Sequence, residues 1–176
     1  MHILAISGSL RHTSTNTNIL KACAKLAPPG VEIKLYDGLD KLPYFSPELD
    51  TETSIPAPAV KDLREQLKHA DAVIFCTPEY AFGVPGSFKN ALDWTVGGGE
   101  FSQKPVAYIT AASVGEKAHE SLGFVLTAIG SAVAGSLRIP FIRAKLTAEG
   151  TIKDPALNES VREVVDALIH SVGNTL

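Results

Sequence analysis

Short apolar runs alternate with amphipathic stretches along the whole chain. The runs that predict strands are His2–Ser7, Val31–Tyr36, Ala72–Thr77, Val106–Ala112 and a weaker one at Ser136–Phe141. Most of them are apolar without interruption, which is typical of strands covered on both faces of a sheet, whereas a strand with one solvated face alternates. The pattern therefore predicts a buried sheet of parallel strands.

Between and after these runs, apolar residues recur at the spacing of an amphipathic helix. The stretches that predict helices are Asn16–Leu26, Ala59–His69, Ser87–Thr95, Ala118–Ile129 and Asn158–Ser171. Strands and helices thus alternate, which indicates an α/β protein with helices on both faces of a parallel sheet. Five strands fit a flavodoxin-like three-layer α/β/α sandwich of strand order 2-1-3-4-5 better than the six-stranded dinucleotide-binding fold.

Length and composition limit the class of protein. The chain has 176 residues, 45% of them hydrophobic and 20% charged, which predicts a single globular domain over residues 1–176. A net charge of −3 argues against a nucleic-acid partner, because such proteins usually need clustered basic residues. Cys23 and Cys76 lack the spacing of a zinc site, so we expect buried free thiols and no metal. No stretch predicts a signal peptide or a membrane span, so we expect a cytoplasmic protein without a membrane partner.

The segment 38–58 differs from the rest of the chain. It is rich in proline and acidic residues and has little periodicity, so we expect a long connection between the second strand and the second helix. Loops of this length in a compact domain are usually functional or form oligomer contacts. A solvated insertion is the alternative, and the sequence favours neither.

The segment 8–16 follows the first apolar run directly and is rich in small polar side chains. Its candidate donors are Ser9, Ser14, Thr15, Asn16 and the guanidinium of Arg11. The unpaired N–H groups at the start of a helix favour an anion, and a guanidinium adds a charged donor. We therefore predict a site for a phosphate monoester. Simple capping of the first helix is the competing interpretation of the Ser, Thr and Asn residues.

A second unusual segment, 78–86, follows the third apolar run. Pro78 and Pro85 restrict the backbone there, while Gly83 and Gly86 permit a positive φ. We expect a rigid loop whose backbone lies flat against a planar ring and presents N–H groups to its edge.

The predicted strand order brings these two segments together. The first and third strands are neighbours whose connections leave in opposite directions, so segments 8–16 and 78–86 face one crevice at the carboxyl ends of the strands. With Tyr80 and Phe82 beside that crevice, the sequence predicts a flat heteroaromatic ligand with an anionic tail. Each aromatic residue taken alone is also compatible with an ordinary core or surface position.

The segment after the fourth predicted strand, 112–116, is a weaker candidate for the same crevice. Ser113 and Gly115 lie at the right end of the strand to approach the ring from its other edge. A solvated loop explains these residues equally well.

Two motifs in these segments resemble the NAD(P)H-dependent FMN reductase family of flavodoxin-like proteins, which includes quinone, chromate and azo-dye reductases. They are Gly-Ser-Leu-Arg-x-x-Ser-x-Asn at Gly8–Asn16 and Pro-Glu-Tyr-x-x-x-x-Pro-Gly-x-x-Lys-Asn-Ala-x-Asp-Trp at Pro78–Trp94. The resemblance extends over essentially the whole chain in length and element order. It implies FMN as cofactor, NADPH or NADH as reductant, and a small acceptor such as a quinone, a free flavin, an azo compound or a metal oxyanion.

The resemblance also assigns roles to single residues. Those that it implies in cofactor binding are Ser9, Arg11, Ser14, Thr15, Asn16, Pro78, Glu79, Tyr80, Ala81, Ser113 and Gly115. The first five would surround the FMN phosphate, the next three would run along the isoalloxazine, and the last two would approach its pyrimidine edge. Ala81 departs from the pattern, because many relatives have Asn there, and the segment 112–116 lacks their glycine-rich sequence. No catalytic residue is assigned, since the resemblance implies ping-pong hydride transfer from the nicotinamide to flavin N5 and then to the acceptor.

Other functions fit the same fold. A non-catalytic electron carrier of the flavodoxin type would bind FMN at the same place, although such carriers are usually strongly acidic. A degenerate flavin-binding module is a further alternative. A small tyrosine phosphatase needs a Cys and an Arg in the first loop, and a receiver domain needs acidic residues where Ser7 and Thr77 stand, so the sequence excludes both.

The predicted crevice is shallow, and a flavin ring in it needs further cover. We therefore expect a homodimer or homotetramer in which a second copy supplies another wall, as is usual in the family. The candidate contacts are the segments 38–58 and 82–94.

Overall fold

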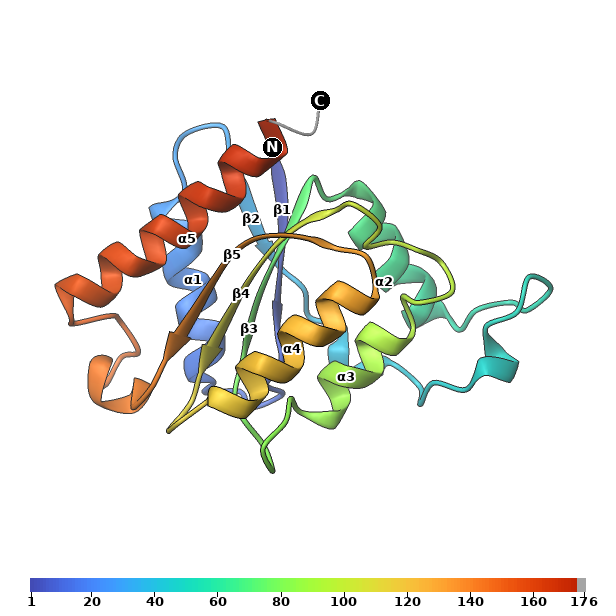
Figure 1. The fold of residues 1–176 in the computed structure, drawn as a ribbon, viewed down its shortest axis with the longest axis horizontal. Helices are drawn as coiled ribbons and strands as arrows, with labels where there is room; N and C mark the ends of the chain where they lie inside the picture. The colour runs from blue at the N-terminus through green and yellow to red at the C-terminus, as the bar shows by residue number, and fades with distance from the viewer. Residues whose placement is uncertain (174–176) are drawn as a thin grey trace.

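The computed structural model describes residues 1–173, which form a five-stranded sheet (Figure 1). The strands are β1 His2–Ser7, β2 Glu32–Leu35, β3 Ala72–Thr77, β4 Pro105–Ala111 and β5 Ala132–Ile139. Neighbouring strands are parallel, and their order is β2-β1-β3-β4-β5. The flavodoxin-like topology predicted from the alternation of elements is therefore confirmed.

Helices cover both faces of this sheet. They are α1 Thr15–Leu26, α2 Pro58–His69, α3 Gly86–Asp93, α4 Glu116–Ala128 and α5 Pro155–Gly173. Figure 1 shows α1 and α5 together on one face and α2, α3 and α4 on the other, which gives the expected three layers. Among residues 1–173, no helix has the length and apolar character needed to cross a membrane.

The two faces of the central strands contribute to separate apolar clusters. Ile74 of β3 belongs to the cluster that contains Ile19 of α1, whereas its neighbour Phe75 packs against Phe88 of α3 with ring centroids 5.2 Å apart. Every residue of β3 and β4 is buried. Because both faces of these strands are covered, their sequences are apolar without alternation.

The expected bounds of the fifth strand are wrong. The sequence pattern places it at Ser136–Phe141, but β5 begins at Ala132 and ends at Ile139. The strand lies at the edge of the sheet and most of its residues are at least partly exposed. Small residues such as Ala134 and Gly135 take the place of an apolar run, because an edge strand has less surface to bury.

The segment 38–58 forms the predicted connection between β2 and α2. It contains the short 3-10 helices η1 Leu39–Lys41 and η2 Pro47–Leu49, and its cyan part extends away from the sheet in Figure 1. Tyr44 and Ile55 in this segment are 91% and 95% exposed.

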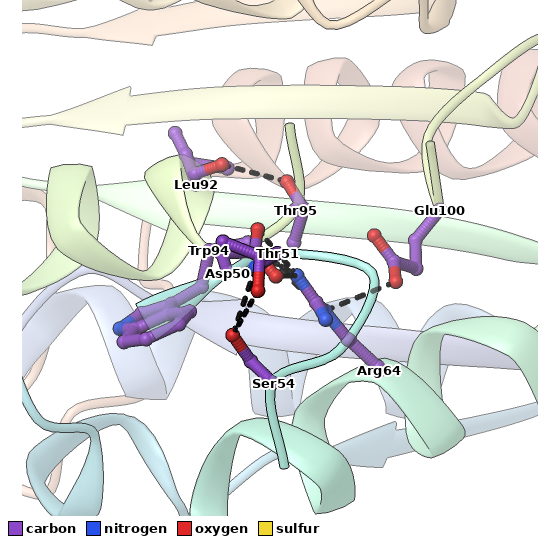
Figure 2. Close-up of polar contacts among 8 residues, drawn as sticks. All are labelled: Asp50, Thr51, Ser54, Arg64, Leu92, Trp94, Thr95 and Glu100. Atoms are coloured by element: carbon purple, nitrogen blue, oxygen red, sulfur yellow. Dashed lines mark hydrogen bonds and ion pairs between the residues drawn. The ribbon is translucent and has the colours of Figure 1, made fainter. Parts of the chain in front are cut away.

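Two groups of contacts anchor this segment to the body of the protein. The carbonyl oxygen of Pro43 accepts a hydrogen bond from the indole N–H of Trp94 at 2.8 Å. Further along, Arg64 of α2 donates to both carboxylate oxygens of Asp50 at 2.7 and 2.8 Å. Figure 2 shows the same guanidinium reaching the carbonyl oxygen of Trp94 and the carboxylate of Glu100, the latter at 3.2 Å. The segment is therefore a packed loop with exposed tips, and not a wholly solvated insertion.

Candidate functional site

A cavity of about 330 Å³ lies at the carboxyl ends of β1, β3 and β4. The predicted site residues that line it are Ser9, Arg11, Ser14, Thr15, Asn16, Pro78, Glu79, Tyr80 and Ser113. Ala81 and Gly115 do not line it, although each lies next to a segment that does. The structure therefore brings most of the predicted residues to one place, from three separate loops.

The loop after β1 reaches this cavity because Gly8 has no side chain. Its backbone N–H donates to the carbonyl oxygen of Cys76 at 2.8 Å, which continues the pairing of β1 with β3. A Cβ on Gly8 would lie 2.4 Å from the Oγ1 of Thr77, so any other residue would push the two loops apart. Glycine here sets the spacing between the two main walls of the cavity.

The start of α1 both caps itself and leaves donors free. The Oγ of Ser14, the N-cap residue, accepts a hydrogen bond from the N–H of Thr17 at 3.4 Å. The next two residues, Thr15 and Asn16, line the cavity, and within the described residues their backbone N–H groups have no hydrogen-bond partner. Capping and anion binding are thus compatible, since the cap satisfies one N–H group and leaves others available.

Asn16 joins the ends of the neighbouring strands beneath the cavity. Its side chain is buried, and its amide nitrogen, oriented toward acceptors, lies 3.0 Å from the carbonyl oxygen of Thr77 and 3.3 Å from that of Ala111. The side chain therefore links the first turn of α1 to the last residues of β3 and β4. Any contact that Asn16 makes with a ligand comes in addition to this structural function.

The loop after β3 contains a tight turn from Tyr80 to Gly83. The N–H of Tyr80 donates to the carbonyl oxygen of Gly83 at 2.9 Å, and the N–H of Gly83 donates back at 3.0 Å. The two central residues, Ala81 and Phe82, have φ values of 49° and 61°. Gly83 and Gly86, which permit a positive φ, do not adopt one, because a two-residue turn of this kind needs the left-handed conformation at its central positions, here Ala81 and Phe82. Non-glycine residues adopt it only at a cost in energy.

Glu79 connects the loop after β3 to α4. Its Oε2 accepts a hydrogen bond from the backbone N–H of Ala118, in the first turn of that helix, at 2.9 Å. The N-cap residue Gly115 has a φ of 80° and no side chain with which to cap the helix itself. The carboxylate of Glu79 supplies the missing acceptor and favourably meets the positive end of the helix dipole.

The fourth wall of the cavity escaped prediction from the sequence. It consists of Phe141, Ile142, Arg143 and Ala144, in and beside the short helix η3, Ile142–Lys145. The N–H of Phe141 donates to the carbonyl oxygen of Ser113 at 3.1 Å, so this segment lies directly beside the end of β4. The strand order alone contained the signal, because it places the residues after the fifth strand next to those after the fourth.

The titratable groups around the cavity are suited to binding more than to acid–base chemistry. No His or Cys residue lines the cavity among the described residues. His119 lies behind the fourth-strand loop, half-buried, with its Nδ1 3.1 Å from the Oγ1 of Thr110 and its ring against that of Tyr108. Burial and the charge of Arg138 lower the pKa of His119, which leaves it neutral at pH 7.

Neither cysteine lines the cavity, although the Sγ of Cys76 lies 3.3 Å from the side-chain amide of Asn16, which does. Cys23 and Cys76 are buried and unpaired, as expected. Burial raises the pKa of the Cys23 thiol to about 12 and also raises that of Cys76. In the part of the chain that the structure describes, no group of three His, Cys, Asp or Glu residues is placed to hold a metal ion.

Comparison with known proteins gives consistent results. Residues 1–141 match the family model described as NADPH-dependent FMN reductase. Among solved structures, the fold is similar to that of the flavoenzyme NAD(P)H:(acceptor) oxidoreductase FerB from Paracoccus denitrificans, with a TM-score of 0.78 and 25% sequence identity over 98% of this chain and 97% of that chain.

Two curated relatives illustrate the sequence similarity. An NAD(P)H-dependent FMN reductase from Pseudomonas aeruginosa is 41% identical over 113 residues, which cover 63% of this chain and 60% of the relative. A quinone reductase from Escherichia coli is 35% identical over 94 residues, which cover 53% of this chain and 50% of the relative. The matched part thus spans only about half to three fifths of these relatives' lengths.

Proposed function

Because the chain belongs to the NADPH-dependent FMN reductase family, we propose that it is an NAD(P)H-dependent oxidoreductase that holds FMN in the cavity at the ends of β1, β3 and β4. The whole of residues 1–176 would act as one FMN-binding domain. Its partners would be small molecules, with no nucleic acid or membrane involved.

The observation that carries this proposal is the presence of two kinds of wall around one cavity. The loop after β1 and the start of α1 offer donors to a dianion, from Arg11 and the free N–H groups of Thr15 and Asn16. The loop after β3 offers Pro78 and Tyr80 as a largely apolar wall. FMN combines a phosphate with a planar heteroaromatic ring, so this donor set and this wall fit the group.

FMN, when bound, supplies the redox chemistry, in ping-pong order from NADPH or NADH to a quinone, free flavin, azo compound or metal oxyanion. The residues of the chain would bind FMN and orient it. Ser9 and Ser14 would join Arg11 around the phosphate, and the backbone at Ser113 would approach the pyrimidine edge. Tyr80, which is 51% exposed, would border the open side that the nicotinamide and the acceptor reach in turn.

Exposed apolar side chains near the mouth of the cavity support assembly into a homodimer or homotetramer. Phe82 and Phe141 are 80% and 69% exposed, and Val114 is 54% exposed. A second copy would cover these residues and the open side of the site. Size-exclusion chromatography with light scattering tests this, and a monomer with full flavin-dependent activity would contradict it. The free thiols of Cys23 and Cys76 fit the cytoplasm that we propose as its location.

The decisive experiment is a spectroscopic titration of the purified protein with FMN, followed by anaerobic addition of NADPH or NADH. We expect a bound flavin whose absorption bleaches with the nicotinamide and returns when a quinone is added. A protein that takes up no FMN would be a degenerate module. One that binds FMN but is not reduced by either nicotinamide would be an electron carrier, which the modest net charge of −3 disfavours.

A further inference from the structure

The cavity contains a second arginine besides that of the β1 loop. Arg143 lines it from η3, and its side chain is exposed, like that of Arg11. Neither guanidinium has a hydrogen bond or an ion pair with any residue in the range 1–173. Glu79 is the one carboxylate among the described lining residues, and it already accepts a hydrogen bond from Ala118. The cavity therefore presents two cations, and neither is in an ion pair with the carboxylate of Glu79 or with any other acidic side chain among residues 1–173.

The backbone that carries Arg143 is fixed on both sides. Before it, the N–H of Phe141 donates a hydrogen bond to the carbonyl oxygen of Ser113 in the loop after β4, and Ile142 is buried with only 4% of its surface exposed. After it, Leu146 is buried and pairs with Ile152 in a short antiparallel bridge. Arg143 thus projects from an ordered segment, which lowers the entropic cost of holding a ligand.

The residues around and after Arg143 pack toward the start of α1. Ile142 and Leu146 belong to the same apolar cluster as Ile19 of α1. Gly150 approaches Asn18, in the first turn of α1, so closely that a Cβ on the glycine would overlap the Asn18 amide. The loop after η3 therefore lies beside the first turn of α1, and Arg143 shares one cavity with Arg11 and with the free N–H groups of Thr15 and Asn16.

We propose that Arg143 is a second phosphate-binding residue, which acts with Arg11 on the phosphate of FMN and makes the site selective for FMN over riboflavin. This rests on the proposed function. A phosphate monoester carries a charge of about −1.5 to −2 at pH 7, so a single guanidinium leaves part of it uncompensated. Two guanidinium groups and a helix N-terminus together match a dianion, whereas riboflavin has no group that needs them.

Titrations with two flavins test this assignment. We would measure the Kd of FMN and of riboflavin, by flavin fluorescence, for the native protein and for Arg143→Ala, Arg143→Lys and Lys145→Ala. We expect Arg143→Ala to raise the Kd of FMN about tenfold or more, the range of a lost charge-assisted contact, and to leave that of riboflavin within about twofold. Arg143→Lys should restore part of the FMN affinity. The Lys145→Ala variant is the matched control, because it removes a positive charge from the same short helix at a residue that does not line the cavity. It should bind FMN and riboflavin with the affinities of the native protein.

Each other outcome overturns the proposal in a recognisable way. An unchanged Kd of FMN in Arg143→Ala removes Arg143 from the phosphate site while the proposed function stands. An unchanged Kd combined with a raised KM for NADPH assigns the residue to the dinucleotide instead. Equal losses for FMN and riboflavin indicate a structural effect, which thermal unfolding of the variant would reveal. A native protein that binds no FMN overturns the proposed function and this inference together.

Discussion

Two regions of this protein use arginine in opposite ways. The side chain of Arg64 is only 20% exposed, and its donors are engaged by Asp50, Glu100 and the carbonyl oxygen of Trp94 (Figure 2). Arg11 and Arg143 are exposed at the cavity, and neither guanidinium has a partner among residues 1–173.

The difference separates a charge that holds the fold from a charge that is available to a ligand. Arg64 ties the segment 38–58 to α2 and to the residues after α3, so its donors are already used. A phosphate that approached it would have to displace two carboxylates. At the cavity no such competition exists, so the electrostatic free energy of the two arginines becomes available only when an anion binds.

Removing the paired arginine, Arg64, should have the largest effect on stability. We expect Arg64→Ala to lower the free energy of unfolding by about 3–5 kcal/mol, because it leaves Asp50 and Glu100 as largely buried carboxylates without a counter-charge. Urea unfolding followed by circular dichroism measures this. Arg162→Ala is a matched control, since Arg162 pairs with Glu159 at 3.6 Å on the surface and should cost less than about 1 kcal/mol.

Two equal and small losses of stability would remove the contrast between the arginines. The comparison also predicts that Arg64→Ala binds FMN with the affinity of the native protein, measured without urea at a temperature at which the variant stays folded. A parallel loss of FMN affinity would mean that the two regions are coupled.

Removing an unpaired arginine at the cavity should affect ligand binding and leave stability nearly unchanged. Arg11→Ala is expected to weaken FMN binding by about 1.5–3 kcal/mol through loss of a charge-assisted contact, and to leave the free energy of unfolding without FMN nearly unchanged. Titration with FMN and urea unfolding of the unliganded protein measure the two quantities. Lys21→Ala, an exposed cation on the same helix-and-loop unit that does not line the cavity, should change neither. An unchanged FMN affinity in Arg11→Ala would contradict our assignment of the phosphate end.

The sequence predicted the site to the extent that the site depends on buried strands. β1, β3 and β4 are continuous apolar runs, so their ends were predictable, and the strand order then placed the loops after Ser7, Thr77 and Ala111 side by side. The bounds of β5 were predicted wrongly because an edge strand buries little apolar surface. The residues after it, which form η3, were therefore not considered as part of the site. Arg143 was missed for that reason.

Other features of the site depend on contacts that no local pattern encodes. Nothing in the residues around Arg64 and Arg11 distinguishes a paired guanidinium from a free one, because the partners of Arg64 are remote in sequence. The capping of α4 by Glu79 is a contact of the same kind, made to the distant residue Ala118. Ala81 and Phe82 have positive φ values because the two hydrogen bonds between Tyr80 and Gly83 outweigh the preference of non-glycine residues for a negative φ.

One carboxylate oxygen beside Arg64 lacks a hydrogen-bond partner, and it makes the free energy of unfolding depend on pH. The Oε2 of Glu100 is buried without a hydrogen-bond partner. Burial raises the pKa of Glu100 above its usual 4.5, and the charge of Asp50 adds to this while Arg64 opposes it. The folded protein therefore keeps this proton to a higher pH than the unfolded chain does. Between pH 4.5 and the raised value the folded state binds more protons, so the free energy of unfolding falls as pH rises.

Glu100→Gln should remove this contribution. We expect the stability of the native protein, measured relative to the Gln variant by urea unfolding, to decrease from pH 4.5 upward and then to level off. A difference that stays constant or increases over this range would show that Arg64 compensates the carboxylate fully. The effect belongs to the paired region alone, so the FMN affinity of the variant should equal that of the native protein.

The smallest expected effect concerns the strained turn beside the cavity. Ala81 has a φ of 49°, a conformation that Asn tolerates better than Ala. We expect Ala81→Asn to raise the free energy of unfolding by about 0.5–1 kcal/mol, part of the cost of a left-handed residue. Gly83→Ala is the matched control: Gly83 does not have a positive φ, and a Cβ there would meet only the Tyr80 carbonyl oxygen at 3.9 Å, so Ala should be accepted. If Ala81→Asn is neutral and Gly83→Ala destabilises, the glycine carries the positive φ in solution, and the exposed Phe82 next to it is then not held by a left-handed backbone.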